Sequence, residues 1–389
     1  MSLIINILDW VLFVLAAVPV VYFLIFAFAS KTLYTPPSFK KAEKSGRFII
    51  LIPAYNCGEL VLPTVKSALD QDYPRDCYRV VVVSEGLSPE QNEKILSLGA
   101  EVIEVSFEHS SKAKALIAAI DVLGSDAADY VSVLDADNLV ERGYLSALND
   151  AFASGLTDLE AHRSARNRNT PTAVLDAASE EINNSIYRQG HNSLVMSSAL
   201  IGSGMAFKYG WFAENIRLCN TAGEDKELEL LLLSQGIRVH YLPDVLVLDE
   251  KTTKLSSYHK QRRRWISAQY YSFAAAFKWL IPALKNRNVE YLDKMLQWSF
   301  MPRMLMVLII VAMSVACPFI SLPAAMRWWI LLLLLLLSIL MAMPSSQLDA
   351  AFFRSLLALP ALCGSALANL FKLKGNKEKF IVTEHTQQD

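Results

Sequence analysis

The chain alternates between long apolar stretches near its two ends and a more polar, periodic middle. Residues 10–29 contain no charged side chain. At about 1.5 Å per residue, a helix of this length spans about 30 Å, the thickness of a hydrocarbon core. The pattern predicts a membrane-spanning helix within residues 1–30. A secretory signal peptide is the alternative, but the apolar run is long and the first nine residues carry no Lys or Arg.

The middle of the chain alternates short apolar runs with segments of helical periodicity. Strands are expected at residues 48–53, 78–84, 101–105 and 130–134, and helices at residues 60–69, 89–98 and 112–122. This alternation predicts an α/β domain over residues 45–268, with a mostly parallel sheet and helices on both faces. Near-continuous Val and Ile runs suit strands that are buried on both sides.

The second half of this domain is less regular in pattern. Residues 150–200 read as polar and irregular up to a helical stretch around residues 177–189. Such a segment is either a solvated loop or a loop that faces a substrate. A helix over residues 226–233 and a strand over residues 239–248 are expected to follow.

The C-terminal part returns to apolar sequence. Residues 269–300 predict interfacial helices, and residues 301–345 predict two further spans, at 304–322 and 326–343. Residues 351–372 are also apolar but precede a Lys-rich tail, residues 373–389. If they crossed the membrane, that tail would be outside, against the positive-inside rule. We therefore expect an interfacial or re-entrant helix there, followed by a cytosolic tail.

Composition and charge bear on location and partners. Hydrophobic residues make up 53% of the 389 residues, and the net charge of −1 gives no global field for nucleic acid. Basic residues gather instead directly after the first span, at Lys31, Lys40, Lys41, Lys44 and Arg47. This predicts an integral protein of the cell (inner) membrane, with the N-terminus outside and the following domain in the cytoplasm. The five scattered cysteines suggest reduced thiols.

Two carboxylates follow the strand expected at residues 130–134. Asp135 and Asp137 stand where open α/β sheets bind ligands. On an extended chain, residues i and i+2 point the same way, so these side chains could share one hard cation, with a phosphorylated substrate completing its oxygen shell. The same spacing recurs at Asp70 and Asp72, and an exposed turn after the strand is the alternative.

Two further groups carry candidate chemistry. Glu224 and Asp225 open a helical run, where acids often serve only as caps or dipole partners. Gln261, Arg264 and Trp265 lie at i, i+3 and i+4, and so on one helix face. That face can offer a guanidinium fork to a diphosphate and an indole surface to a sugar ring. The alternative is a basic interfacial helix, in which Arg262 and Arg263 face anionic lipid or solvent.

These motifs, in this order, resemble family-2 glycosyltransferases, and in particular the membrane-embedded cellulose and hyaluronan synthases. The resemblance rests on residues 52–56, 67–74, 80–83 and 134–138, on Gly223-Glu-Asp, and on the QxxRW pattern that ends at Trp265. Three positions before the C-terminal tail depart from the family pattern. Glu85 replaces Asp or Asn, Ile117 replaces a common Asn, and Gly223 replaces Thr.

The resemblance implies roles for individual residues. Pro53, Ala54, Tyr55 and Glu85 would hold the base and ribose, and Lys112 would lie near the nucleotide. Asp135 and Asp137 would hold the diphosphate through Mg²⁺ or Mn²⁺, Gly204 would lie beneath the donor sugar, and Asp225 would be the catalytic base beside Glu224. In the tail, residues 380–385 resemble a gating loop of cellulose synthases that carries Thr383, with His385 in place of Lys. A disordered polar tail is the alternative.

The function implied is inverting transfer of a sugar from a nucleotide-diphosphate donor, expected to be a UDP-sugar, to a growing polysaccharide at the membrane. Transfer of a single sugar to a lipid-linked acceptor is the enzymatic alternative. A non-catalytic membrane subunit that binds nucleotide sugars is the alternative from another class. Membrane lipid is an expected partner and nucleic acid is not, while a homo-oligomer or an export partner is left open.

Overall fold

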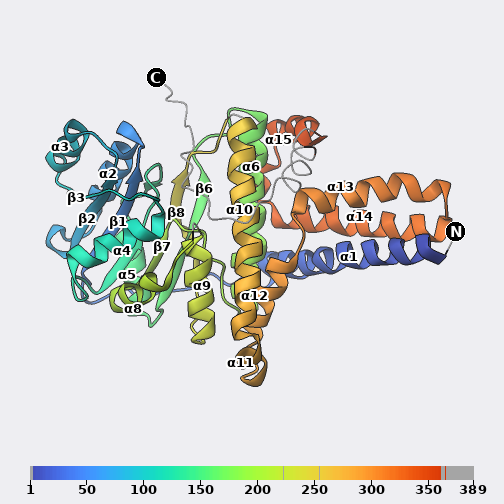
Figure 1. The fold of residues 1–389 in the computed structure, drawn as a ribbon, viewed down its shortest axis with the longest axis horizontal. Helices are drawn as coiled ribbons and strands as arrows, with labels where there is room; N and C mark the ends of the chain where they lie inside the picture. Colours follow the sequence, from blue (N-terminus) through green and yellow to red (C-terminus); the bar gives the residue numbers. More distant parts are fainter. Residues whose placement is uncertain (1–2, 222, 254, 361–363, 365–389) are drawn as a thin grey trace. The chain divides into compact units, whose positions relative to one another are not determined.

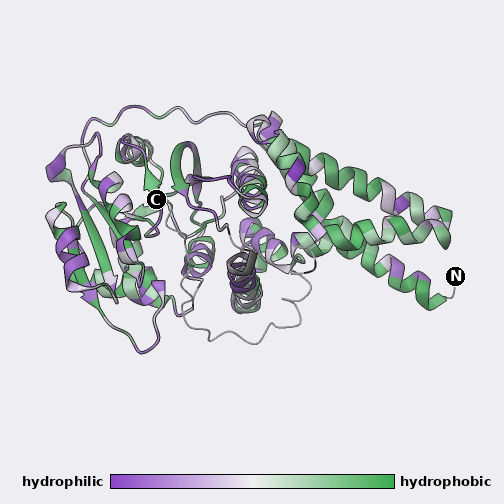
Figure 2. Ribbon diagram, turned by 90° about the horizontal axis from the view of Figure 1, so that it is seen from above, coloured by the Kyte–Doolittle hydropathy of each residue, from purple (hydrophilic) through white to green (hydrophobic). Residues whose placement is uncertain are grey.

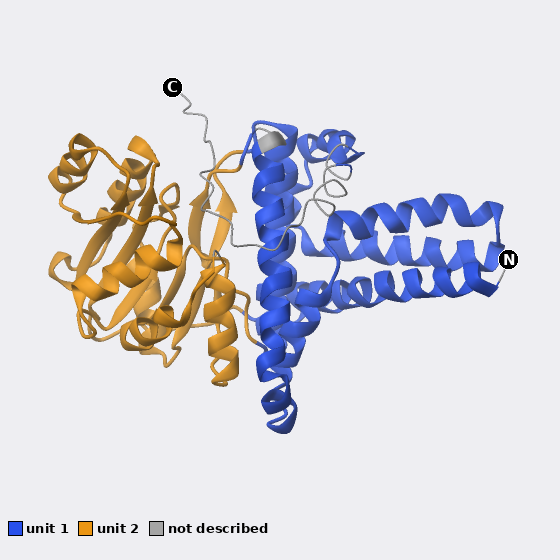
Figure 3. Cartoon of the chain, viewed as in Figure 1, with its two compact units in different colours: residues 1–35, 168–196, 252–375 blue, residues 36–167, 197–251, 376–389 orange. Residues whose placement is uncertain are grey.

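In the computed structural model, residues 3–221, 223–253, 255–360 and 364 are described. The chain divides into two compact units (Figure 3). Unit 1 comprises residues 1–35, 168–196 and 252–375, and unit 2 comprises residues 36–167, 197–251 and 376–389. The expected gating loop with Thr383 lies outside the described residues.

Unit 2 is built on an eight-stranded sheet, counted over the described residues, in the order β3-β2-β1-β4-β7-β6-β8-β5 (Figure 1). The strands are β1 (Phe48–Tyr55), β2 (Tyr78–Glu85), β3 (Glu101–Val105), β4 (Tyr130–Val133), β5 (Leu139–Val140), β6 (Asp158–Ala165), β7 (Met205–Lys208) and β8 (His240–Asp249). Strands β3, β2, β1 and β4 are parallel to one another, so their carboxyl ends meet at one edge. Strand β7 runs antiparallel between β4 and β6, and β6 is parallel to β8.

Helices cover both faces of this sheet. Along β1, Ile50 and Ile52 pack on one side and Ile49 and Leu51 on the other, and all four are fully buried. One face receives α2 (Val61–Leu69), α3 (Pro89–Ser97) and α5 (Tyr144–Ala153), and the other receives α4 (Lys112–Leu123), α8 (Tyr209–Asn215) and α9 (Glu224–Ser234). These helices on both faces confirm the prediction of an α/β domain. The near-continuous apolar runs suit strands that are covered on both sides.

The prediction for residues 150–200 was wrong in part: the helical stretch expected around residues 177–189 is present, but the preceding residues are not irregular, because residues 158–165 form a strand. Strand β6 lies inside the sheet between β7 and β8, and helix α6 (Pro171–Asn183) continues as a π-helical turn, Asn184–Gln189. The strand was missed because three of its buried positions are charged: Asp158, Glu160 and Arg163 are 1%, 0% and 5% exposed. A strand whose interior positions are charged lacks the period-two apolar signal.

Unit 1 contains three apolar helices that pack together: α1 (Leu3–Thr32), α13 (Arg303–Ala316) and α14 (Leu322–Ala342). Hydrophobic residues run along them (Figure 2). Within the described residues, α1 and α14 are long and apolar enough to cross a membrane. Helix α12 (Val289–Ser299) and residues 303–319 would give a third span only as a pair bent by 61°. The third predicted span therefore stays a prediction.

Besides these helices, α6 and α12, the described part of unit 1 contains four further α-helices. They are α7 (Gly190–Ser193), the 22-residue α10 (Leu255–Ala276), α11 (Leu280–Lys285) and α15 (Ala350–Ser355). Helix α15 falls in the stretch expected to be interfacial or re-entrant, and it packs against α6. Its place relative to a membrane stays a prediction.

One ion pair joins α1 to α14. The Arg327 guanidinium donates to Asp9, and the Trp328 indole nitrogen donates to the other oxygen of Asp9 at 2.8 Å. The Arg327 guanidinium carbon also lies 3.9 Å from the ring centroid of Trp10. Charged groups on apolar helices are costly unless they are paired, so this cluster fixes the register of the two helices.

A second polar cluster joins α1 to α7 and α12. The fully buried His191 ring stacks on Phe26, with 3.8 Å between ring centroids, and its Nε2 lies 2.7 Å from the Tyr22 hydroxyl. Tyr22 also donates to Asp293 at 2.8 Å. This close approach needs Gly190, because a Cβ there would lie 2.3 Å from the carbonyl oxygen of Phe26.

The close approach at Gly190 gives a stability prediction. Gly190→Ala forces a methyl group against the α1 backbone, and overpacking of this kind costs about 1–3 kcal/mol. We expect a lower melting temperature for the detergent-solubilised protein, measured by scanning calorimetry. Gly210→Ala in α8 is the control, because nothing lies within 4 Å of the added Cβ. Equal melting temperatures for the two variants would contradict this packing.

Candidate active site

The two candidate metal ligands lie on a turn at the carboxyl end of β4. The strand ends at Val133, and the Asn138 amide donates to the Asp135 carbonyl at 3.1 Å. The extended geometry assumed for Asp135 and Asp137 is therefore wrong. The turn is anchored to α2, since the Thr64 hydroxyl donates to the Ala136 carbonyl at 2.8 Å. Both carboxylates are half-buried.

Lys112 connects this turn to two distant segments. Its Nζ lies 2.5 Å from Asp135 Oδ1, 2.5 Å from the carbonyl oxygen of Gly202 and 3.3 Å from Glu224 Oε1. Only 11% of the Lys112 side chain is exposed. The lysine at the start of α4 thus gathers the β4 turn, the glycine-rich segment at residues 201–204 and the first residue of α9 around one ammonium group.

The charged groups in this cluster shift one another's pKa values. Burial acts to lower the pKa of Lys112, but the carboxylates of Asp135 and Glu224 outweigh it, so the pKa rises and the ammonium stays charged. Burial raises the pKa of Glu224 above its usual range. Lys112 opposes that rise, and the charges of Asp225 and Asp135 add to it.

Asp225, the candidate base, lies beside this cluster. A Cβ on Gly202 would lie 3.5 Å from both Lys112 Nζ and Glu224 Oε1 and 3.7 Å from Asp225 Cβ. Gly202 has a φ of +91°, a backbone conformation that favours glycine. The Asp225 side chain is 18% exposed, against 6% for Glu224. Of the two acids, Asp225 is the more open to an incoming acceptor, and Glu224 is engaged by Lys112.

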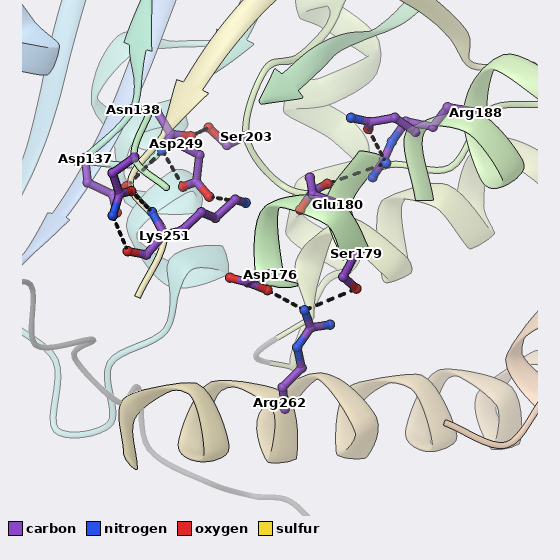
Figure 4. Close-up of polar contacts among 12 residues, drawn as sticks. Asp137, Asn138, Asp176, Ser179, Glu180, Arg188, Ser203, Asp249, Lys251 and Arg262 are labelled. Carbon is purple, nitrogen blue, oxygen red and sulfur yellow. Dashed lines mark hydrogen bonds and ion pairs between the residues drawn. The ribbon is translucent and has the colours of Figure 1, made fainter. Parts of the chain in front are cut away.

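A second polar cluster surrounds Asp137 (Figure 4). The Asn138 side-chain amide donates to Asp137 Oδ1 at 3.0 Å and to Asp249 Oδ1 at 2.9 Å. Ser203 donates to the other end of the Asn138 side chain, and Lys251 Nζ lies 2.7 Å from Asp249 Oδ2. The sequence reasoning missed Ser203, Asp249 and Lys251. Only Asp249 had a sequence signal, as an acid at the end of a predicted strand.

The charge around Asp137 suits a hard cation. Burial raises the pKa of Asp137, and the neighbouring carboxylates of Asp249 and Asp135 raise it further. Such an excess of carboxylate charge is relieved by a divalent cation with oxygen ligands. In the part of the chain that is described, no group of three or more His, Cys, Asp or Glu side chains could hold a metal by itself. Oxygens of a bound diphosphate would therefore have to complete the shell.

The predicted base-binding residues lie at the ends of β1 and β2. Tyr55 pairs with Glu85 across the two strands, and Ala54 packs in the core with 1% exposure. The Glu85 carboxylate accepts from the Ser110 hydroxyl at 2.6 Å and from the Phe107 amide at 3.3 Å. The longer side chain that replaces Asp or Asn thus holds the loop before α4.

Gly204 and Pro53 are two further residues predicted for the site, and both are at least half-buried. At Gly204, a Cβ would lie 2.8 Å from Val247 and 3.2 Å from Ala161, so this glycine lets β7 pack closely on β6 and β8. Pro53, near the end of β1, is half-buried. At the glycine-rich segment it is Gly202, rather than Gly204, that faces the Lys112 cluster.

The QxxRW residues lie on α10 in unit 1, where Gln261, Arg264 and Trp265 are all half-buried. The neighbouring Arg262 does not face solvent or lipid as its sequence context favoured. It donates to Asp176 on α6 (Figure 4). Its guanidinium carbon lies 4.7 Å from the Trp265 ring centroid. One side of the Trp265 indole therefore contacts Arg262, and the roles of Gln261, Arg264 and Trp265 stay predictions.

The family model of glycosyltransferase-like family 2 matches residues 46–268. The chain belongs to this family. It is accordingly a glycosyltransferase, as predicted. No curated protein matches the chain. Among solved structures, it is similar to the mannosyltransferase PcManGT from Pyrobaculum calidifontis in complex with GDP-Man and Mn²⁺, with a TM-score of 0.56 and 20% identity over 94% of this chain and 100% of that chain. At this identity the likeness is one of fold.

The Lys112 cluster gives a prediction with a defined pH dependence. Because the folded-state pKa of Glu224 is raised, its ionisation costs stability as the pH increases, and Lys112 offsets this cost. Breaking a buried ion pair costs about 3–5 kcal/mol. We expect Lys112→Met to lower the melting temperature more at pH 8 than at pH 5, since Glu224 is ionised only in the first case.

Lys114→Met is the matched control for this experiment. Lys114 lies on the same helix but is exposed, and its Nζ donates to the His109 carbonyl at 2.6 Å. Its substitution should change the melting temperature little at either pH. A pH-independent loss in Lys112→Met would mean that Glu224 does not depend on the ammonium group.

Proposed function

We propose that this family-2 glycosyltransferase is a membrane-bound inverting hexosyltransferase that takes its sugar from a nucleotide-diphosphate donor and uses Mg²⁺ or Mn²⁺. The observation that carries the proposal is the Lys112 contact, which joins Asp135 to Glu224 and so brings the candidate metal ligands and the candidate base to one edge of the sheet. Ligands bind at this carboxyl edge in open α/β sheets.

In the proposed reaction, the diphosphate leaves as an acceptor oxygen attacks the anomeric carbon from the opposite side. Asp135 and Asp137 would hold a divalent cation, which supplies positive charge to the departing diphosphate. Asp225 takes the proton of the acceptor hydroxyl, and Glu224, bound to Lys112, fixes the start of α9. Pro53, Ala54, Tyr55 and Glu85 border the place proposed for the base and ribose.

Residues outside this edge are assigned by the resemblance alone. Arg264 would bind the diphosphate, Trp265 would face a sugar ring, and Gln261 would lie on the same side of α10. Thr383 would offer a hydroxyl to a phosphate. The catalytic domain would be cytoplasmic at the inner membrane, with residues 269–300 and 351–372 at the membrane surface.

Two acceptors are proposed. The QxxRW motif and its order after the acidic motifs support transfer to a growing polysaccharide, as in the cellulose and hyaluronan synthases. The small number of candidate spans, two or at most three over the described residues, favours a lipid-linked acceptor, because a channel for a polymer needs more helices than one such chain supplies. A UDP-sugar is the expected donor, and the GDP-Man bound by the similar mannosyltransferase makes GDP-sugars the second set to test.

A donor panel tests the proposed function. We expect the protein, purified into lipid nanodiscs, to release UDP or GDP from one class of nucleotide sugar and to stop in excess chelator. Product sizing then separates a polymer from a single sugar on lipid. Absence of nucleotide release from every donor, with lipid acceptors present, would contradict the proposal. Full turnover in excess chelator would contradict the requirement for a divalent cation.

The proposed base gives a kinetic prediction. Asp225→Asn should bind donor normally and lower turnover by roughly 10² to 10⁴, the usual contribution of a positioned base. Glu224→Gln should lower turnover less. Glu227→Gln is a control on the same helix. The Glu227 carboxylate accepts from the backbone amides of Asn220 and Thr221, both at 3.0 Å, and so holds the loop before the helix. Equal losses in Asp225→Asn and Glu227→Gln would make Asp225 structural.

A further inference from the structure

Asn138 occupies the centre of the hydrogen-bond network beside the proposed cation. It is fully buried, and so is Ser203. The Ser203 hydroxyl accepts from the Asp135 amide at 2.9 Å and donates to Asn138 Oδ1. The orientation of the Asn138 carboxamide is thereby set, since its oxygen faces the hydroxyl and its nitrogen faces the carboxylates.

The nitrogen of this carboxamide bridges two acids from different parts of the chain. It donates to Asp137 Oδ1 at 3.0 Å and to Asp249 Oδ1 at 2.9 Å (Figure 4). Asp137 lies on the β4 turn, whereas Asp249 is the last residue of β8. Two carboxylates that share one NH₂ group are held close together despite their mutual repulsion.

The far side of Asp249 is neutralised. Lys251 Nζ lies 2.7 Å from Asp249 Oδ2, and the Lys251 side chain is 2% exposed. The Lys251 backbone is itself fixed, because its amide donates to Asn167 Oδ1 at 2.7 Å and its carbonyl accepts from Asn167 Nδ2 at 3.0 Å. Asp249 therefore has a fixed place and a counter-charge, and it presents one oxygen to Asn138.

We propose that Asn138 is a positioning residue of the metal site, with Asp249 and Lys251 as its fixed support. This inference rests on the proposed function, in which Asp137 and Asp135 bind a divalent cation. Ser203 fixes both the backbone of Asp135 and the carboxamide of Asn138, and Asn138 fixes the carboxylate of Asp137. One network thus orients both ligands before the cation arrives. Outer partners of this kind commonly contribute 10–100-fold to metal affinity.

The test measures Mn²⁺ binding directly, by electron paramagnetic resonance of the free ion, first with Mn²⁺ alone and then with saturating UDP or GDP. Asn138→Ala should weaken Mn²⁺ binding by 10–100-fold. Ser203→Ala should weaken it by a smaller factor, since the Asn138 side chain remains. In the assay, the Mn²⁺ concentration for half-maximal rate should rise in both variants while kcat at saturating Mn²⁺ changes little.

Asn149→Ala is the matched control for a merely structural role. Asn149 is also a buried asparagine of unit 2 that links two segments, donating to the Lys44 carbonyl at 2.9 Å and accepting from the Gly46 amide at 3.1 Å. It should lower the melting temperature as Asn138→Ala does but leave Mn²⁺ affinity unchanged. Ser203→Ala keeps the test decisive should Asn138→Ala fail to fold.

The outcomes separate this inference from the proposed function. Wild-type affinity in Asn138→Ala and Ser203→Ala, with Mn²⁺ bound by the wild-type protein, would overturn the positioning role alone. An equal loss of Mn²⁺ affinity in Asn149→Ala would also overturn it, because general destabilisation of the fold would then explain the loss in both variants. A wild-type protein that binds no Mn²⁺ with either nucleotide would overturn the cation assignment and this inference with it.

Discussion

The contact of the Lys112 ammonium with two carboxylates is the interaction on which the proposed active site at the carboxyl edge of the sheet depends. Asp135 and Glu224 come from segments about ninety residues apart, and both are drawn to the same Nζ. At about 4 Å and an effective dielectric constant near 20, a pair of unit charges interacts by about 4 kcal/mol. Without the ammonium group, that interaction would be a repulsion between acids at the end of β4 and the start of α9.

The same rule organises the polar groups of unit 1. Asp9 is paired with Arg327 between α1 and α14, and Asp176 with Arg262 between α6 and α10. Buried charge is expensive unless it is paired and hydrogen-bonded. These pairs therefore specify how the helices align, a task that apolar helix surfaces perform poorly because many registers bury similar areas.

Glycine positions permit the close contacts that these networks need. Gly202 lets the backbone bring its carbonyl to Lys112, and Gly190 lets α7 meet the backbone of α1. At Gly190 a methyl group would clash with the Phe26 carbonyl oxygen, whereas at Gly202 glycine is favoured by the backbone φ of +91°. The glycine-rich segment at residues 201–204 thus contributes backbone and a hydroxyl, from Gly202 and Ser203, rather than a side chain that reacts.

The sequence by itself determined the strands β1 to β4, their helices and the two long apolar helices, because each is a local pattern of apolar residues. It also placed Asp135, Asp137 and Asp225 at the ends of such elements. Tertiary structure alone decided that β6 lies inside the sheet, that Lys112 meets Glu224, that Asp249 joins Asp137 through Asn138, and that Arg262 turns inward. Each of these depends on which segments become neighbours in the sheet or helix layer. A local pattern cannot encode it, because the partners are separated by tens of residues and polar side chains on a buried strand carry no periodic apolar signal.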